Sequence, residues 1–121
     1  MKREEFFEAW IKALESGEYK QGKGALANRR DGNFDFCCLG VACMVDGRSA
    51  VRINGLAFLP EKLSEKLDID YRGCFISNVK HRGKIYLNLA QMNDAGVSFK
   101  TIAKVIRDQL KSGNFRSHDG T

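Results

Sequence analysis

Long apolar runs and proline are both scarce in this sequence. The longest uninterrupted apolar stretch, CCLGVACMV, has nine residues, whereas a helix that crosses a membrane needs about 20. The first residues, MKREE, are mostly charged, unlike the apolar centre of a signal peptide. We therefore expect neither an export signal nor a membrane span, and we place the chain in the cytoplasm with no membrane partner.

Cysteine pairs at metal-binding spacing are also missing. None of Cys37, Cys38, Cys43 and Cys74 forms the Cys-x-x-Cys pair of a structural zinc site. In a reducing compartment such thiols stay unpaired, and free cysteine usually packs as a small buried side chain. No Walker or Rossmann glycine pattern is present either. The sequence therefore predicts buried cysteines, no metal and no cofactor.

The N-terminal half alternates helical and hairpin signals. Residues 2–16 have the apolar spacing of an amphipathic helix, and a glycine follows directly as a stop. The Asp-Gly pair of RDGN, between GALAN and NFDFC, predicts a β-hairpin. Its second strand would direct Phe34, Phe36 and Cys38 to one face. The wholly apolar segment CCLGVACMVDG predicts a buried helix over about 38–46.

The C-terminal half carries turn and cap signals. Two short β-prone runs flank Asn54-Gly55, and Pro60 opens a short helix. The segment CFISNVKHRGKIYL predicts a second hairpin that turns near Arg82-Gly83. A pair of helices follows, separated by NDAG, and Ser98 caps the second helix.

Together these signals predict an α+β fold in a single compact domain over residues 1–121. It comprises an N-terminal helix, a buried central helix, short β-hairpins and a C-terminal helix pair. The polar residues 111–121 are expected to form a frayed tail.

Positive charge is concentrated towards the C-terminal end. The net charge is +5, and residues 80–121 hold eight Lys and Arg against three Asp and Glu. On the last predicted helix Lys100, Lys104, Arg107 and Lys111 fall on one side, opposite the apolar stripe. Such a field favours a polyanionic or phosphate-bearing partner.

Catalysis by cysteine is one alternative. Cys37 or Cys38 at a helix N-terminus could be activated, with His81 as the base. This layout resembles papain-like and NlpC/P60 hydrolases, although no third polar residue is placed to orient the imidazole. We favour a non-enzymatic role.

Binding of nucleic acid is another alternative. The segment LAQMNDAGVSFKTIAKVI resembles the opening of a helix-turn-helix, but RDQLKSGNFRSHDGT provides no recognition helix after it. Any contact with nucleic acid would therefore use the basic face of the last helix.

Four segments carry a resemblance to a known family. They are WIKALESGEYKQGKGAL, FCCLGVAC, an LP pair before a short helix, and LAQMNDAGVSFKTIAKVI. In these segments the chain resembles a family of small uncharacterised proteins of bacteriophage and prophage genomes. The shared pattern is Trp-x-x-Ala-Leu-x-Ser-Gly-x-Tyr-x-Gln, then Cys-Cys-Leu-Gly-Val-x-Cys, then Asn-Asp-x-Gly-x-Ser-Phe-x-x-Ile-Ala. The resemblance implies a phage-type accessory protein in the cytoplasm of a bacterial host.

The functional hypothesis is therefore stoichiometric binding. By analogy with other small phage proteins, the chain would inhibit a host defence protein or sequester a nucleotide-like anion. A nucleotide pocket should collect Arg and Lys beside an aromatic such as Tyr19 or Tyr71. The candidate contacts are Arg29, Arg30, Lys80, His81, Arg82, Lys84, Lys100, Lys104, Arg107 and Lys111.

Overall fold

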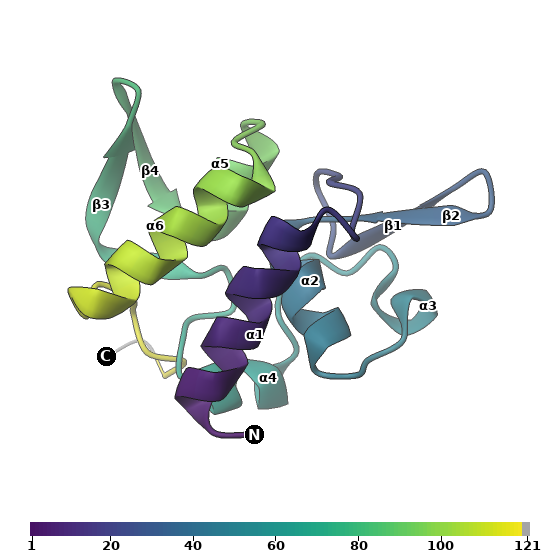
Figure 1. Ribbon diagram of the computed structural model, residues 1–121, viewed down its shortest axis with the longest axis horizontal. Coiled ribbons are helices and arrows are strands. Elements are labelled where there is room, and N and C mark those ends of the chain that lie inside the picture. The colour runs from purple at the N-terminus through teal and green to yellow at the C-terminus, as the bar shows by residue number, and fades with distance from the viewer. Residues whose placement is uncertain (120–121) are drawn as a thin grey trace.

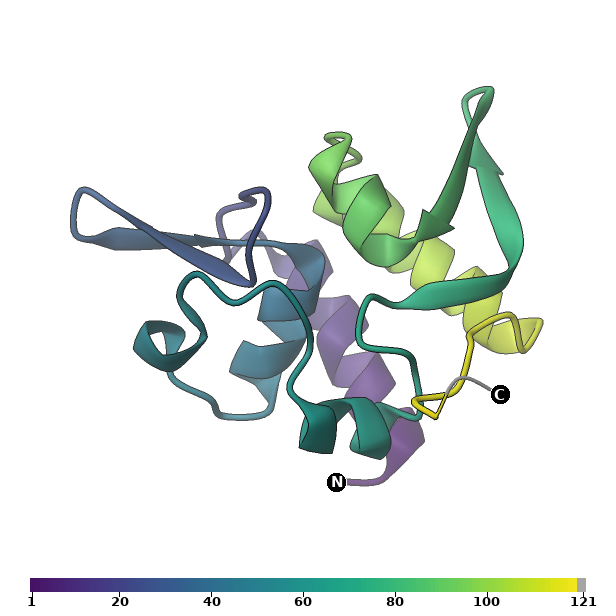
Figure 2. The same cartoon turned by 180° about the vertical axis from the view of Figure 1, so that it is seen from behind.

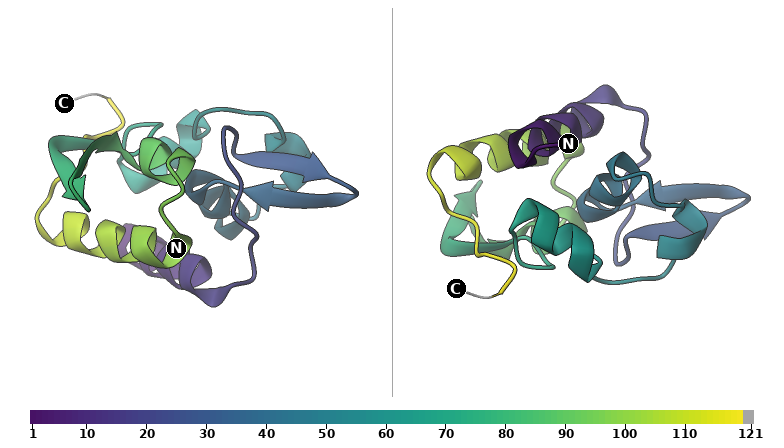
Figure 3. Two further views of the ribbon diagram at one scale, coloured as in Figure 1. Left: turned by 90° about the horizontal axis from the view of Figure 1, so that it is seen from above. Right: turned by 90° about the horizontal axis from the view of Figure 1, so that it is seen from below.

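The computed structural model, which describes residues 1–119, confirms the α+β fold: helices surround a buried centre, and two separate hairpins project from it (Figure 1). The hairpins lie at opposite ends of the molecule in the views from above and below (Figure 3). They have no strand in common, because each forms its own two-stranded antiparallel sheet.

The N-terminal helix α1 (Arg3–Ser16) matches the predicted helix over 2–16. Its apolar stripe is fully buried, and Gly17 ends the helix in the left-handed conformation with a φ of 79°. The indole N–H of Trp10, which lies in that stripe, donates to the carbonyl of Cys38 at 2.9 Å. Helix α1 is thereby fixed against the centre of the fold.

The first hairpin also forms as predicted. Strands β1 (Ala27–Arg30) and β2 (Asn33–Phe36) are joined by Asp31-Gly32, whose φ angles of 50° and 81° suit a tight hairpin turn. The predicted alternation onto Cys38 is wrong, because β2 ends at Phe36 and Cys38 is already the first residue of the next helix.

The central helix α2 (Cys38–Val45) is buried from Cys38 to Cys43, as the sequence predicts. It lies so close to Leu26, the residue before β1, that a Cβ at Gly40 would be 1.8 Å from the Leu26 carbonyl oxygen. Only glycine fits this crossing of two backbones.

The β-prone runs around Asn54-Gly55 do not pair with each other, so that prediction is wrong. The first run forms the single turn α3 (Ala50–Ile53). The next residues bond to the chain at β1 instead: Gly55 N–H donates to Ala27 O at 2.9 Å, and Leu56 O accepts from Leu26 N–H at 2.7 Å. The Asn-Gly signal therefore marks a bend towards an existing strand.

The C-terminal half follows the prediction closely. Helix α4 (Glu61–Leu67) begins after Pro60, and the second hairpin turns at Arg82-Gly83. Its strands lead into the helix pair, in which α6 packs against α1 and α5 packs against α2 (Figures 1 and 2). The bounds are β3 (Cys74–His81), β4 (Lys84–Asn88), α5 (Leu89–Asp94) and α6 (Phe99–Lys111).

The expected frayed tail over 111–121 is different in the structure. Phe115 is buried and forms a bridge with Phe75 of β3, and Arg116 N–H donates to Cys74 O at 2.9 Å. Residues 115 and 116 therefore pair with the edge of β3 that does not face β4. The end of the predicted tail, residues 120–121, lies outside them. Within residues 1–119, no helix is long and apolar enough to cross a membrane.

Candidate functional site

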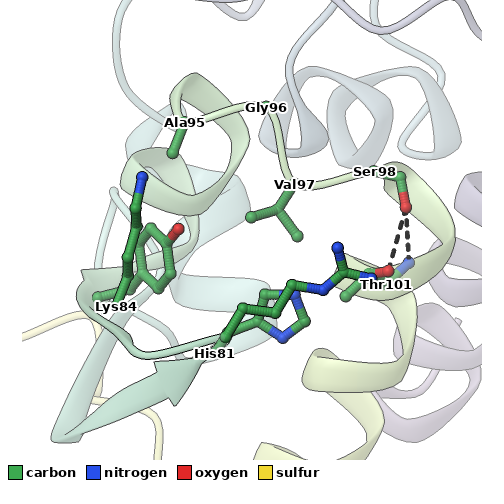
Figure 4. A pocket seen from close by; sticks show the side chains of 9 residues that line it. His81, Lys84, Ala95, Gly96, Val97, Ser98 and Thr101 are labelled. Carbon is green, nitrogen blue, oxygen red and sulfur yellow. Dashed lines mark hydrogen bonds between the residues drawn. The ribbon is translucent and has the colours of Figure 1, made fainter.

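The tip of the second hairpin faces the start of α6 across a pocket of about 340 Å³ (Figure 4). His81 ends β3, Arg82 lies in the turn and Lys84 begins β4, so the hairpin supplies one cationic wall. Three candidate residues of this loop therefore lie together, as the sequence predicted. The sequence did not indicate the opposite wall of the pocket. The lining is His81, Arg82, Lys84, Tyr86, Ala95, Gly96, Val97, Ser98 and Thr101.

The opposite wall is the N-terminus of α6 and the loop before it. The Ser98 hydroxyl accepts the Thr101 N–H at 3.3 Å and donates to the Thr101 hydroxyl at 3.1 Å, which caps the helix. The side chain of Val97 points into the space between the two walls (Figure 4). The positive end of the helix dipole therefore lies across from three basic side chains.

The charge of this pocket is uncompensated. None of its nine lining residues is a carboxylate, and no ion pair in the described chain involves His81, Arg82 or Lys84. The hydroxyl of Tyr86 forms no hydrogen bond to another residue in 1–119, so it is available to a ligand. An anion with polar oxygen atoms suits this lining best.

A further cation, Lys23, lies near the pocket, and its position was not predicted from the sequence. A Cβ at Gly96 would lie 3.8 Å from the Lys23 ammonium nitrogen, so Lys23 lies close to the loop wall. Lys23 and Gly96 are 73 positions apart. No local signal in GKGAL indicates that they meet.

A second cavity of about 360 Å³ adjoins the first along α6. It shares His81 and Thr101 with the first pocket and adds Lys80 and Lys104, with Asp108 as the one carboxylate in its lining. Two more candidate cations therefore extend the basic surface along the hairpin and the helix.

The two candidate residues of the first hairpin, Arg29 and Arg30, make contacts within that hairpin. Arg30 binds the buried carboxylate of Asp35 at 2.7 Å, and the guanidinium of Arg29 lies over the Phe34 ring at 5.8 Å. Because the two hairpins lie at opposite ends of the molecule (Figure 3), Arg29 and Arg30 take no part in the pocket.

The basic stripe of α6 is divided. Arg107 forms two hydrogen bonds, of 3.1 and 3.3 Å, to the Glu8 carboxylate of α1. This contact raises the pKa of Arg107 and lowers the pKa of Glu8. Lys111 lines a different cavity with Arg107, while Lys100 is exposed and lines neither pocket at the hairpin. Of the stripe, only Lys104 joins the hairpin cations.

The aromatic side of the pocket is neither of the expected tyrosines. Tyr19 packs edge to face on Phe36 with ring centroids 5.5 Å apart, and Tyr71 lines another cavity. The aromatic residue beside Arg82 and Lys84 is Tyr86. Side chains along β4 alternate between the interior and solvent, and Tyr86 is the buried one. The strand pattern therefore predicts that Tyr86 points inward, but it does not predict which residues lie across the pocket.

Three of the cysteines, Cys37, Cys38 and Cys43, are buried, and Cys74 is partly exposed. Burial raises the pKa of Cys37 to about 11 and of Cys43 to about 12, and raises that of Cys38 well above its ordinary value. Burial likewise raises the pKa of Cys74 to about 11. Within residues 1–119, His81 forms no hydrogen bond to a cysteine. A thiolate and its base are therefore not assembled here, which leaves the hydrolase alternative without support.

A metal site is not formed by the described residues. Among residues 1–119, no group of three or more His, Cys, Asp or Glu side chains is arranged to hold an ion. The described part of the chain therefore has a basic pocket but no cluster of metal ligands.

Three residues that the sequence analysis quoted, Gln21, Cys38 and Asn93, meet in a polar network around the fully buried Asn93. Gln21 donates to Asn93 Oδ1 at 3.0 Å and to Val97 O at 2.7 Å, and it accepts from Phe99 N–H at 3.1 Å. Asn93 also accepts from Cys38 N–H at 3.1 Å. These hydrogen bonds therefore hold the loop before α6 and the first residue of α6 in place.

Comparison with known families gives a match over the N-terminal part of the chain. A family described as "Domain of unknown function (DUF8296)" matches residues 1–50 of the chain. This region covers α1, the first hairpin and α2, and it does not include the cationic pocket. No curated protein and no solved structure matches the chain.

Proposed function

We propose that this chain is a non-enzymatic phage-type accessory protein that captures a nucleotide-like anion in the pocket between the second hairpin and α6. The single observation that supports it most is a concave site with three unpaired basic side chains, a helix N-terminus and no carboxylate. The resemblance of the sequence to a phage family supports a role as an inhibitor of defence in the cytoplasm of a bacterial host.

The size and the polar groups of the pocket define the part of a ligand that it accepts. A volume of about 340 Å³ lies at the small end of the roughly 300–1,000 Å³ typical of ligand sites. Phosphate oxygens would accept hydrogen bonds from Arg82 and Lys84 and would lie at the positive end of the α6 dipole. Tyr86 offers a hydroxyl and one ring edge for the sugar or base.

Thermal denaturation with adenosine 5′-monophosphate and with pyrophosphate tests this proposal. A ligand at about 100 times its Kd adds about 2.7 kcal/mol to the folded state, which raises the Tm by roughly 10 °C in a chain of this size. The double variant Arg82→Glu/Lys84→Glu should lose this rise, since it reverses two charges in the pocket.

The matched control is Lys20→Glu/Arg29→Glu, which changes the net charge equally at residues outside the pocket. It should keep the full rise in Tm. The proposal fails if neither probe raises the Tm of the wild-type chain, or if the pocket variant responds as strongly as the control.

A second candidate function is the binding of a nucleic-acid strand. The adjoining cavity favours it, because Lys80 and Lys104 continue the cationic surface beyond the first pocket. A strand of phosphates could follow these residues along α6, whereas a single nucleotide would need only the first pocket.

A further inference from the structure

Another cavity, of about 520 Å³, shares no lining residue with the pocket at the hairpin tip and is lined by a different kind of residue. Its lining is Phe58, Leu59, Glu61, Ser64, Tyr71 and His118. Lysine and arginine are absent from this lining, so the cavity does not repeat the chemistry of the anion pocket. Leu59 and Ser64 are 4 % exposed and form its base.

Two aromatic rings shape this cavity. The rings of Phe58 and Tyr71 meet nearly at right angles, with an interplanar angle of 75° and centroids 5.1 Å apart. They are 43 % and 46 % exposed. The guanidinium carbon of Arg72 lies over the Phe58 ring, 4.8 Å from its centroid, so Tyr71 is the ring with the more open surface. The Leu59 N–H donates to the Tyr71 carbonyl at 3.0 Å, which fixes the two segments to each other. This corner is therefore held by the backbone before any ligand binds.

Two polar groups in the lining have unused hydrogen-bonding capacity. The carboxylate of Glu61 forms no ion pair or hydrogen bond with another residue in 1–119. The imidazole of His118 is held through Nδ1 by Asp68 Oδ1 at 3.0 Å, which leaves Nε2 without a partner in the same part of the chain. Ser64 contributes little, because its hydroxyl already donates to Ile69 O.

We propose that the cavity formed by Phe58, Tyr71, Glu61 and His118 binds an uncharged planar nucleobase of the purine type. The Tyr71 ring provides the stacking surface, and base-on-aromatic stacking is favourable for any flat heteroaromatic ring. The Glu61 carboxylate accepts from ring and exocyclic N–H groups, and the free nitrogen of His118 meets a second polar atom of the same ring. A purine base carries both kinds of edge, whereas an indole ring has one N–H donor only.

Guanosine tests the site because it has the base without a phosphate, which separates this proposal from the anion pocket. We expect saturable shifts of the Leu59 and Tyr71 amide signals in two-dimensional NMR spectra of the full chain. Tyr71→Ala should weaken binding at least about fivefold, because it removes the stacking surface. The backbone bond at Tyr71 O does not need the side chain, so the fold should persist.

Two further variants sharpen the test. Tyr71→Phe keeps the ring and should bind guanosine as the wild-type chain does, whereas Glu61→Gln loses the charged acceptor and should bind several times more weakly. The pocket variant Arg82→Glu/Lys84→Glu should keep guanosine binding while it loses the response to pyrophosphate.

The proposal is overturned if guanosine causes no saturable shifts, or if Tyr71→Ala binds it unchanged. Binding of N-acetyl-tryptophanamide without binding of guanosine would also overturn it, since the cavity would then suit a protein side chain. Failure of the pyrophosphate response alone would count against the anion pocket and leave the base site intact.

Discussion

The side-chain oxygen of Asn93 accepts the backbone N–H of Cys38 at 3.1 Å, across 55 positions of the sequence. The amide of Asn93 also donates to Gly22 O at 2.8 Å, and Asn93 is fully buried. One side chain thus satisfies the first N–H of α2 and a carbonyl of the long connection before β1. These groups would otherwise be buried without partners.

Replacing Asn93 should therefore be costly. Asn93→Ala leaves the N–H of Cys38 and the carbonyl of Gly22 unpaired, and we expect a loss of roughly 3 kcal/mol in the free energy of unfolding. Asn78→Ala is the control, because Asn78 is exposed in β3 and should change stability by less than about 0.5 kcal/mol. Urea denaturation of both variants measures the difference. A loss at Asn93 no larger than that at Asn78 would show that the network contributes little.

Alanine substitutions at two glycines distinguish a loss of stability caused by a steric clash from one caused by backbone conformation. Gly40→Ala would place a Cβ 1.8 Å from Leu26 O, so the two backbones must move apart and the expected loss is about 3 kcal/mol. Gly17→Ala has open space but a φ of 79°, so it should cost only about 1 kcal/mol. Thermal unfolding of the two variants gives the order, and a reversed order would contradict the close contact of α2 with Leu26.

Thiol labelling checks the state of the cysteines. In the native chain at pH 7.5 we expect Cys74 to react first with an aromatic disulfide reagent, since it is the one partly exposed thiol among the four. Cys37 and Cys38 should react only as fast as the chain opens, because burial raises the pKa of each. Rapid labelling of Cys37 or Cys38 would restore the hydrolase alternative.

The pair of Asp68 and His118 predicts a pH dependence of stability. The contact raises the pKa of His118, so its contribution is complete below the unfolded value of about 6.5 and is lost as the pH rises through the folded value. It lowers the pKa of Asp68, whose contribution is complete above about 4 and is lost as the pH falls through the folded value.

Asp68→Asn should therefore destabilise the chain most between about pH 4 and 6.5. Asparagine also tolerates the left-handed φ of 51° at this position, so the change isolates the charge. Chemical denaturation at pH 5.5 and 8.5 should give a larger difference from wild type at pH 5.5. An equal difference at both values would mean that His118 is not charged in the pair.

The nucleic-acid alternative predicts unequal roles for two cations of α6. Binding of a single-stranded 20-mer should weaken with salt, and Lys104→Gln should reduce the slope by about 0.7 because one phosphate contact is lost. Arg107→Gln should leave the slope unchanged, since Arg107 is paired with Glu8. Fluorescence anisotropy over a salt series measures both slopes. Equal effects of the two variants would argue against a strand path through the adjoining cavity.

Much of the fold could be predicted because its signals are local. The stop at Gly17, the turns at Asp31-Gly32 and Arg82-Gly83 and the cap at Ser98 each depend on a few consecutive residues. Asn54-Gly55 carries an equally strong local signal, yet the backbone there bonds to the chain at β1. A turn dipeptide fixes a bend, but the partner of the bent segment is decided by tertiary contacts.

For the same reason, only part of the candidate site could be predicted from the sequence. The sequence identifies His81, Arg82 and Lys84 as one basic loop, because they are nearly consecutive. It does not show that this loop faces Ser98 and Thr101, that Lys23 lies close by, or that Glu8 engages Arg107. Each of these relationships joins residues from separate elements, and residue spacing along the chain carries no information about them.

Both ends of the described chain attach to the same end of α4. The Arg3 guanidinium donates to Leu67 O at 2.6 Å, and His118 binds the next residue, Asp68. A short flexible linker could therefore join the two ends, with new termini opened at the exposed Asp31-Gly32 turn. Such a circular permutant would keep every contact of the cationic pocket while freeing the first hairpin as a point of attachment for labels or fusion partners.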